Sequence, residues 1–291
     1  MPRAANGGGS IIAPMVELSR TVRFCLDPDP AAWDRPRHNG FAGWPPMRGL
    51  GRYYQLIVLA RGEPDPQTGY FMDIRHMDAA VRRHALPVAL DALRADSADG
   101  HGVAIGTLMD RMFQALDPAL DHTLIELALA LTPFLHVAQR RDDVGCVLIR
   151  HRYEFAAAHR LHVPQLDDEA NRRIFGKCNN PAGHGHNYEL EVAVRVPVTP
   201  RGDVLSAGEL DALVDRCVLQ KLDHKHLNVD VPQFEGVNPS VENIARIIFE
   251  MLDPHVPSLD GHGTGRAELD SVSVWETPKT VCTYRRPARQ G

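Results

Sequence analysis

The sequence predicts an α+β fold in which helices cover one face of an antiparallel sheet. Apolar and polar residues alternate from Tyr188 to Val196, which is the pattern of a half-buried strand. Between Val241 and Leu252, apolar side chains recur at helical spacing. Strands, two helices and again strands follow one another along the chain, and this order is typical of α+β domains.

The same order of elements is expected twice, because the two halves of the chain can be aligned. GLGRYYQLIVLARG, which begins at Gly49, matches GHGHNYELEVAVRV, which begins at Gly183, at an offset of 134 residues (183 − 49). Three further matches follow in the same order, and their offsets rise slowly, as insertions in loops would cause: Met77–Ala79 with Leu210–Ala212, Phe113–Pro118 with Phe249–Pro254, and Ala130–Pro133 with Trp275–Pro278. We therefore expect a duplicated unit.

Each unit is expected to contain two strands, two helices and two strands. In the first unit these elements are Thr21–Leu26, Tyr54–Ala60, Ile74–His84, Gly106–Leu116, Ile125–Leu131 and Phe134–Arg140. In the second unit they are Arg152–Ala158, Tyr188–Val196, Ser206–Leu219, Val241–Leu252, Leu269–Trp275 and Thr280–Arg285. The chain accordingly divides into a flexible tail (1–15), a first repeat (16–145) and a second repeat (146–291).

Composition limits the classes of function. The 291 residues carry a formal net charge of −5 without any block of like charge, which argues against nucleic-acid and membrane-surface binding. The longest nearly apolar run, Leu124–Leu135, is too short to span a bilayer and contains Glu126. The amino terminus lacks an apolar export segment, so the five cysteines are expected to be reduced thiols in a cytoplasmic protein.

Three histidines are candidate metal ligands. His184 and His186 lie two residues apart at the start of a predicted strand, so both imidazoles point to the same side. His159, at the end of the preceding strand, supplies a third ligand, whereas His162 lies beyond that strand and is expected to be a loop residue. Three histidines would leave one position of a tetrahedral Zn²⁺ ion open for water or substrate.

Other side chains near this cluster are candidates for proton transfer and substrate binding. Cys178 is either a fourth, structural ligand or a free thiol in the cleft, and we favour the free thiol because a closed metal site has no catalytic use. If Asp223 and His224 fold beside Cys178, the aspartate orients the histidine and the histidine withdraws the thiol proton. Glu276, at the end of a strand, is suited to accept two N–H groups of a heterocycle.

Two residues near the start of the last predicted helix are weaker candidates for substrate contacts. Ser240 can cap this helix, and capping by itself explains the residue. Glu242 occupies the first turn, where a carboxylate is favourable, and is also a candidate to face the ligand.

The motifs FAAAH, FGKCNNPAGHGHNY, LDHKHLN, PSVEN and VWETP, in this order, resemble the 6-pyruvoyl-tetrahydropterin and 6-carboxy-tetrahydropterin synthase family over about Val147 to Arg286. The resemblance implies a tunnelling fold, or T-fold, whose antiparallel sheets form barrels by homo-oligomerisation. It implies 7,8-dihydroneopterin triphosphate as the small-molecule substrate. It also implies a role for each matched position: zinc binding for His159, His184 and His186, catalysis for Cys178, Asp223 and His224, and pterin anchoring for Glu276.

The resemblance leaves the product open. The base rate among bacterial relatives favours 6-carboxy-5,6,7,8-tetrahydropterin, formed with acetaldehyde and triphosphate in 7-deazaguanine and queuosine biosynthesis. The five-residue gap between Cys178 and His184 instead resembles enzymes that form 6-pyruvoyl-tetrahydropterin. Two other classes remain alternatives, a non-catalytic pterin- or purine-binding module and a zinc-dependent hydrolase. A deaminase would need Pro-Cys-x-x-Cys and His-x-Glu motifs, which the sequence lacks.

The first repeat lacks the chemical groups of the second. Its aligned positions hold Trp44 for Cys178, Leu50 and Arg52 for the paired histidines, Leu131 for Glu276 and about Pro28 for His159. We therefore expect a degenerate, non-catalytic repeat that supplies sheet edges and one wall of the cleft.

Overall fold

An antiparallel sheet forms the framework of the protein. The computed structural model describes residues 15–26, 53–99, 103–199, 205–259 and 267–286. In these residues the strands are β1 (Val16–Cys25), β2 (Tyr53–Gly62), β3 (Leu124–Ala130), β4 (Leu135–Arg140), β5 (Cys146–His159), β6 (His184–Pro197), β7 (Lys225–His226), β8 (Glu268–Thr277) and β9 (Thr280–Arg285). The sheet order is β1-β2-β3-β4-β5-β6-β8-β9, and the short strand β7 pairs in parallel with β5. One sheet therefore runs through both predicted repeats.

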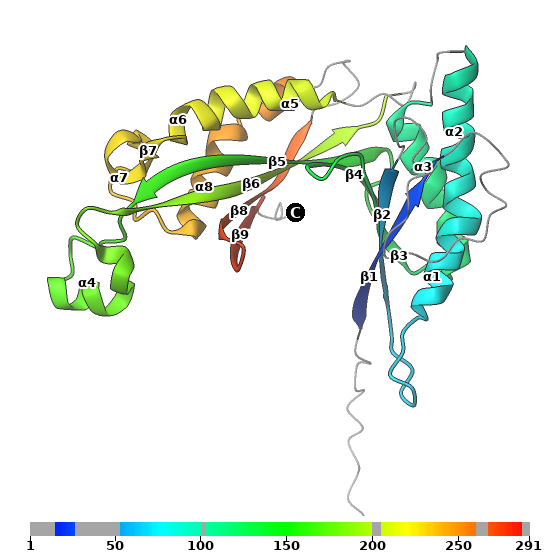
Figure 1. Ribbon diagram of the computed structural model, residues 1–291, viewed down its shortest axis with the longest axis horizontal. Helices are drawn as coiled ribbons and strands as arrows, with labels where there is room; N and C mark the ends of the chain where they lie inside the picture. Colours follow the sequence, from blue (N-terminus) through cyan, green and yellow to red (C-terminus); the bar gives the residue numbers. More distant parts are fainter. Residues whose placement is uncertain (1–14, 27–52, 100–102, 200–204, 260–266, 287–291) are drawn as a thin grey trace, which may run out of the picture.

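Two sets of helices accompany the sheet, one in each half of the chain (Figure 1). In the amino half they are α1 (Ile74–Ala80), the π-helical turn η2 (Val81–Ala85), α2 (Leu86–Asp99), α3 (Ile105–Leu116) and η3 (Asp117–Leu120). In the carboxyl half they are α4 (Asp168–Phe175), η4 (Gly176–Asn179), α5 (Ala207–Val214), the π-helical turn η5 (Asp215–Leu219), α6 (Gln220–Leu222), α7 (Leu227–Asp230), η6 (Pro232–Phe234), α8 (Val241–Leu252) and η7 (Val256–Leu259). Within the described ranges, no helix has the length and apolar character needed to cross a membrane.

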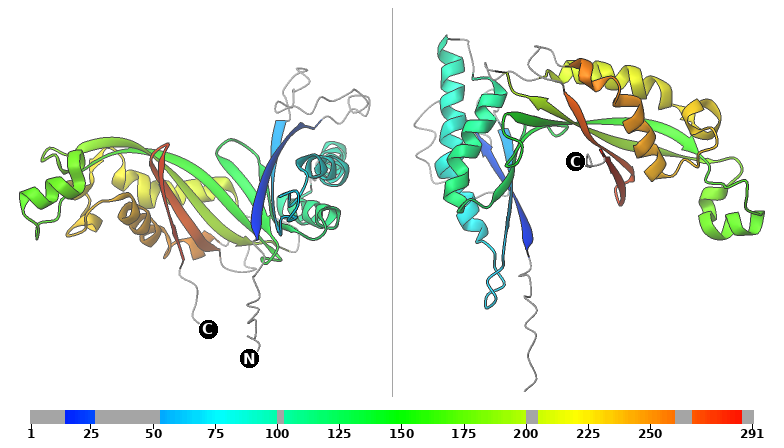
Figure 2. Two further views of the ribbon diagram at one scale, coloured as in Figure 1. Left: turned by 90° about the horizontal axis from the view of Figure 1, so that it is seen from below. Right: turned by 180° about the vertical axis from the view of Figure 1, so that it is seen from behind.

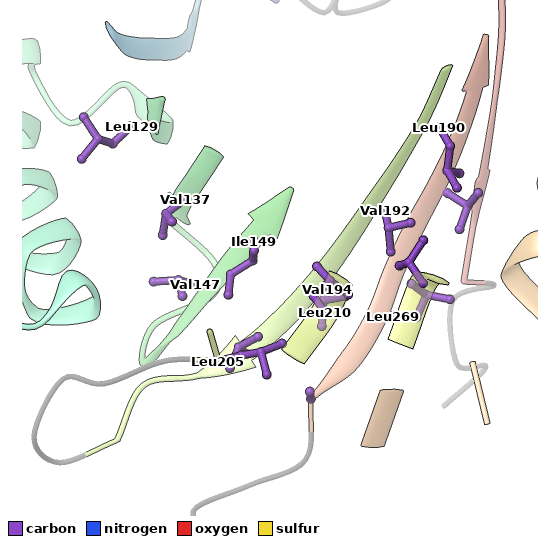
Figure 3. Packing of buried hydrophobic residues seen from close by; sticks show 14 of the residues in the cluster. Leu129, Val137, Val147, Ile149, Leu190, Val192, Val194, Leu205, Leu210 and Leu269 are labelled. Atoms are coloured by element: carbon purple, nitrogen blue, oxygen red, sulfur yellow. The ribbon is translucent and has the colours of Figure 1, made fainter. Parts of the chain in front are cut away.

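The hydrophobic core of the carboxyl half lies between β6, β8 and the helices. The even-numbered residues of β6 from Tyr188 to Val196 are buried, as their alternation predicts. Helix α8 buries Ile244, Ile247 and Ile248 on one side and begins at the cap residue Ser240. Figure 3 shows side chains of β6 beside those of α5 and β8 in this core.

Most predicted elements are confirmed, and three differences have physical reasons. The helix predicted to end at His84 continues to Asp99, because the missing N–H of Pro87 falls next to the π-helical turn, where the regular hydrogen-bond ladder is already interrupted. Helix α4 was not predicted, since it has only eight residues and few apolar ones. The short elements β7 and α7 were also missed, because they depend on contacts with the distant strand β5.

The two halves share side-chain contacts as well as the order of their elements. In the amino half, Arg20 of β1 donates two hydrogen bonds of 2.8 Å to Asp78 of α1. In the carboxyl half, the Tyr153 hydroxyl of β5 donates a 3.0 Å hydrogen bond to Asp211 of α5. Both pairs are 58 residues apart in the sequence. In each half, the first strand of the predicted unit is thus joined to the first predicted helix.

Two further features recur in both halves. The π-helical turns η2 and η5 interrupt the first long helix at the same place, five residues each. Each half also has an arginine that forms an ion pair with an aspartate and lies over a phenylalanine ring, with distances of 5.9 and 5.7 Å from the guanidinium carbon to the ring centroid. These clusters are Phe113, Asp117 and Arg141, and Phe249, Asp253 and Arg286.

The halves are joined where β4 pairs with β5. The antiparallel register runs from Leu135 opposite His151 to Ala138 opposite Leu148. At the end of β4, the Arg140 guanidinium contacts Glu126 of β3 at 3.2 Å and Asp270 of β8 at 2.8 Å. Arg140 therefore links strands from both halves that are not neighbours in the curved sheet (Figure 2).

Arg140→Ala is expected to lower the free energy of unfolding by about 1–3 kcal/mol, because two largely buried carboxylates would lose a shared cation. Burial, the largest influence, raises the pKa of Glu126 and of Asp270, but the neighbouring arginines outweigh it, so both pKa values lie below their ordinary values of 4.5 and 3.8. Groups with a lowered pKa stabilise the fold above these values and lose that contribution as the pH falls through the folded-state pKa. The difference from the natural sequence should therefore shrink below about pH 4 in urea unfolding.

Arg61→Ala is the matched control, since its ion pair with Glu17 is about half exposed on both sides. We expect a change of about 0.5 kcal/mol or less for this variant. Equal losses in the two variants would contradict a special role for Arg140.

Candidate functional site

The three predicted histidine ligands meet at the paired ends of β5 and β6. His159 lies opposite His184 in the register, and Ala157 lies opposite His186. The ring centroids are 4.6 Å apart for His159 and His184, 5.3 Å for His159 and His186, and 4.8 Å for His184 and His186. One nitrogen of each ring lies within 4.8 Å of the others. Among the described residues, this is the group of side chains arranged to hold a metal ion.

The nitrogen atoms of this histidine cluster fit a metal ion. Nδ1 of the buried His159 is 2.7 Å from the Pro239 carbonyl oxygen, to which it donates in the tautomer that leaves Nε2 free. Nε2 of His159 is 3.2 Å from Nε2 of His184. Two nitrogen ligands of a tetrahedral zinc ion, each at about 2.0–2.1 Å, would be about 3.3 Å apart. Nε2 of His186 is buried and has no hydrogen-bond partner, as expected for a ligand atom.

Burial favours the neutral form of two imidazoles of this cluster, His159 and His184. Desolvation is the largest cause that lowers the pKa of His159, and its neighbour His184 lowers it further. Desolvation also lowers the pKa of His184, with His186 as the next cause. Only the neutral ring has a lone pair for a cation, so the lowered pKa values favour metal binding at neutral pH.

Gly183 allows the chain to enter β6 beside these rings. Its φ of +71° lies in the left-handed region, and a Cβ atom here would lie 2.7 Å from His226 Nε2 and 2.9 Å from the His159 carbonyl oxygen. His226 is held there by the pairing of β7 with β5 opposite Ala158. Sequence reasoning missed His226 and the Pro239 carbonyl, because neither contact is visible without the fold.

Cys178 lies beside the histidine cluster in the turn η4. The Leu161 amide donates a 2.9 Å hydrogen bond to the Cys178 carbonyl oxygen, and the Asn179 side chain donates one of 2.7 Å to the Leu161 carbonyl oxygen. These bonds hold the turn against the segment that follows β5. Cys178 and His184 line the same cavity, of about 770 Å³, but the thiol does not belong to the group within ligand distance. This placement favours the free thiol over a fourth metal ligand.

Asp223 and His224 form a pair beside β5. Asp223 accepts a 2.8 Å hydrogen bond from the Ala156 amide, and its other carboxylate oxygen is 2.9 Å from His224 Nδ1. The Ala156 amide is the largest cause of the lowered pKa of Asp223. The His224 side chain is 83% exposed, and its φ is +56°. Within the described residues, no hydrogen bond joins this pair to Cys178, and neither Asp223 nor His224 lines the cavity that Cys178 lines.

Glu276 lies next to the histidine cluster, from the far end of β8. Its Oε1 atom is 3.4 Å from His159 Nε2 and 3.7 Å from His186 Nε2, and its side chain is 22% exposed. Ser240 caps α8 by accepting from the Asn243 amide at 3.5 Å. Glu242 is exposed, and the Ser240 side chain is the largest cause that lowers its pKa. The structure therefore places Glu276 in the site, and it gives Ser240 and Glu242 a capping environment.

Comparisons with known proteins identify the family of the carboxyl half. The model of the family "6-pyruvoyl tetrahydropterin synthase" matches residues 148–287. The 6-pyruvoyl tetrahydrobiopterin synthase of Drosophila melanogaster is 41% identical over 142 residues, which are 48% of this chain and 79% of that protein. The human protein of the same name is 38% identical over 138 residues, which are 47% of this chain and 90% of that protein. The chain belongs to the 6-pyruvoyl tetrahydropterin synthase family.

Membership in the 6-pyruvoyl tetrahydropterin synthase family rests on the carboxyl half, which contains all nine predicted site residues. A solved structure of the Caenorhabditis elegans enzyme has 37% sequence identity, covers 49% of this chain and 96% of its own, and gives a TM-score of 0.43. The family model does not extend into the amino half. Of the amino-half positions aligned with the site, Pro28, Trp44, Leu50 and Arg52 lie outside the described residues, and Leu131 follows the end of β3.

Gly183→Ala is expected to lower zinc affinity about tenfold or more. The new methyl group would push against His226 and the His159 backbone, and so shift His159 within the histidine cluster. Zinc affinity is measured by competition with a chromogenic chelator. Gly236→Ala is the control, since Gly236 has nearly the same φ, +70°, but nothing within 4 Å of its Cβ position. Both variants carry the backbone cost of about 1–2 kcal/mol, so equal zinc affinities would contradict the role assigned to Gly183.

Proposed function

We propose that the carboxyl half is a zinc-dependent lyase that converts 7,8-dihydroneopterin triphosphate to 6-pyruvoyl-tetrahydropterin and triphosphate. The observation that carries this proposal is the histidine cluster with a carboxylate on one side and a free thiol close by. The names of the similar proteins from Drosophila melanogaster and human support a pterin substrate and the pyruvoyl product.

Each proposed residue has one chemical task. His159, His184 and His186 hold a zinc ion, which when bound supplies a Lewis acid for the hydroxyl groups of the substrate side chain. Glu276 accepts hydrogen bonds from the amino group and ring N–H of the pterin, and so positions the three-carbon side chain over the metal site. Cys178 moves protons between carbon atoms of that side chain, and the Asp223–His224 pair exchanges protons with the thiol.

The exposed Asp223–His224 pair supports a homo-oligomer. The His224 side chain is 83% exposed, and within the described residues it has no hydrogen bond to Cys178 of its own chain. We infer that the pair of one copy faces the Cys178 of a neighbouring copy. This arrangement agrees with the T-fold barrels that the sequence resemblance implies.

The 6-carboxy product remains the second candidate. The base rate among bacterial relatives favours it, and nothing in the geometry of the described residues distinguishes the two products. The pyruvoyl reaction has the support of the relatives' names and of the five-residue gap between Cys178 and His184. Retention of a pterin without any turnover would instead indicate a binding module.

We also propose that the chain consists of two tandem T-fold units, of which only the second is catalytic. Support comes from the shared order of elements, the matching strand-to-helix hydrogen bonds and the matching π-helical turns. The division at residues 145 and 146 falls immediately before β5. The amino half then acts as a structural partner, since β4 covers the edge of β5, whose other end carries His159.

Incubation of the full chain with dihydroneopterin triphosphate is expected to release triphosphate and give a pterin with the mass of the 6-pyruvoyl product. Detection of acetaldehyde and 6-carboxy-tetrahydropterin would select the second candidate instead. Cys178→Ala should retain zinc and reduce turnover by about 100-fold or more, because it removes the proton-transferring group but no metal ligand. Cys282→Ala, another half-buried thiol of this half, is the control and should remain active. Loss of zinc in Cys178→Ala would contradict the assignment of a free thiol.

Deletion of the amino half tests its structural role. A chain of residues 146–291 exposes the edge of β5, so we expect it to aggregate or to lose most of its turnover relative to the full chain. Size-exclusion chromatography and the triphosphate-release assay measure both effects. Full turnover by a discrete oligomer of this shorter chain would show that the amino half is dispensable for the site.

A further inference from the structure

The cavity beside Cys178 is lined by positive side chains. It has a volume of about 770 Å³ and opens between the end of β5, helix α4 and the turn η4. Arg160, Arg172 and Lys177 line it, together with a single acidic residue, Asp168. A cavity of this size is typical of small-molecule sites. Its charge indicates an anionic ligand.

These three cations are not neutralised by carboxylates in the described part of the chain. The Arg160 guanidinium is held by a 3.3 Å hydrogen bond from Nε to the Asn179 carbonyl oxygen, and it forms no ion pair there. Asp168 precedes Arg172 by one helical turn, but no ion pair joins them. Most other arginines of the carboxyl half, such as Arg195 and Arg286, do pair with carboxylates. The charge of the cavity therefore remains available to a ligand.

The position of the cavity defines a direction through the site. Glu276 contacts the histidine cluster at His159 and His186, and it is not part of the cavity wall. Cys178 and His184 line the cavity. From one end of the site to the other, the groups are therefore the Glu276 carboxylate, the histidine cluster, the Cys178 thiol and the three cations.

We propose that Arg160, Arg172 and Lys177 form the subsite for the triphosphate group of the substrate. This inference rests on the proposed function. With the pterin ring on Glu276 and its side chain over the histidines, the triphosphate at the end of that side chain extends into the cavity. When the carbon–oxygen bond to the triphosphate breaks, the electron pair stays on the departing phosphate oxygen, and the cations stabilise that charge. The proton removed from the neighbouring carbon is taken up by the Cys178 sulfur, and the electron pair of the broken carbon–hydrogen bond forms a carbon–carbon double bond.

Titration calorimetry with inorganic tripolyphosphate tests the subsite without turnover. The zinc-loaded full chain is compared with the double variant Arg172→Gln/Lys177→Gln, whose affinity should fall about tenfold or more because two charge-assisted contacts are lost. Arg160 is left unchanged, since it also holds the loop at Asn179. Arg173→Gln is the matched control, because Arg173 is the next residue of α4 and does not line the cavity. Zinc content is measured before and after each titration, because tripolyphosphate also binds metal ions.

A second probe separates the subsite from the rest of the site. Unphosphorylated dihydroneopterin should bind the double variant and the natural sequence with equal affinity, since its contacts lie at Glu276 and the histidines. The subsite is refuted if the natural protein does not bind tripolyphosphate, if the double variant binds within about twofold of it, or if Arg173→Gln loses as much affinity. If the double variant loses tripolyphosphate affinity but the natural protein does not convert dihydroneopterin triphosphate, the anion-binding subsite is supported and the proposed reaction is contradicted.

Discussion

The register between β5 and β6 is the constraint on which the site depends. The two strands pair without interruption from Cys146 opposite Pro197 to His159 opposite His184. A shift of one residue would turn every side chain of one strand to the other face, and the imidazoles would then separate. Several contacts along the pair oppose such a shift, including the stacked rings of Phe155 and Tyr188, whose centroids are 5.0 Å apart. The histidine cluster is thus positioned by a long, well-packed ladder rather than by loops.

The amino half supports this ladder from the other side. In-register pairing joins Ala128 to Ala138 and Ala138 to Leu148 across β3, β4 and β5, and these three residues are almost fully buried on the face opposite the main core. Around them, Arg140 and Arg150 share the carboxylate of Glu126. This face of the curved sheet therefore carries small apolar side chains and paired charges. The amino half therefore fixes the strand that presents His159.

Local patterns account for what the sequence predicted correctly. The alternation in β6 has a period of two, so it places His184 and His186 on one side without knowledge of the fold. The spacing of Ile244, Ile247 and Ile248 similarly identifies the buried side of α8. The convergence of His159 with this pair required one further assumption, that the two strands are neighbours, and the likeness of the motifs to a known family supported it.

Contacts between distant segments account for what the sequence could not predict. The Pro239 carbonyl oxygen contacts a histidine 80 residues away, and no sequence pattern marks a carbonyl group as a partner. The position of Asp223 against the Ala156 amide is likewise set by a distant strand, since β7, which pairs with β5 just after Asp223 and His224, has two residues and no periodicity to detect. The sequence of helix α4 does contain features typical of helices, since Asp167 caps its start and Arg172 and Arg173 lie in its last turn. Because α4 is short and largely exposed, these features did not predict the helix or the cavity that it lines.

Under the proposed function, the order of charges through the site also determines which way the substrate enters. A molecule with N–H donors at one end and phosphates at the other matches a carboxylate at Glu276 and cations at Arg160, Arg172 and Lys177. In the reversed orientation, the phosphates would meet the partly buried carboxylate of Glu276, and the ring donors would meet cations that accept no hydrogen bonds. The reversed complex is disfavoured at both ends, so selection arises from repulsion as well as attraction. Because the histidine cluster lies between the two ends, only the favoured orientation brings the side-chain carbons to the Cys178 sulfur with the phosphates already on the side where they leave.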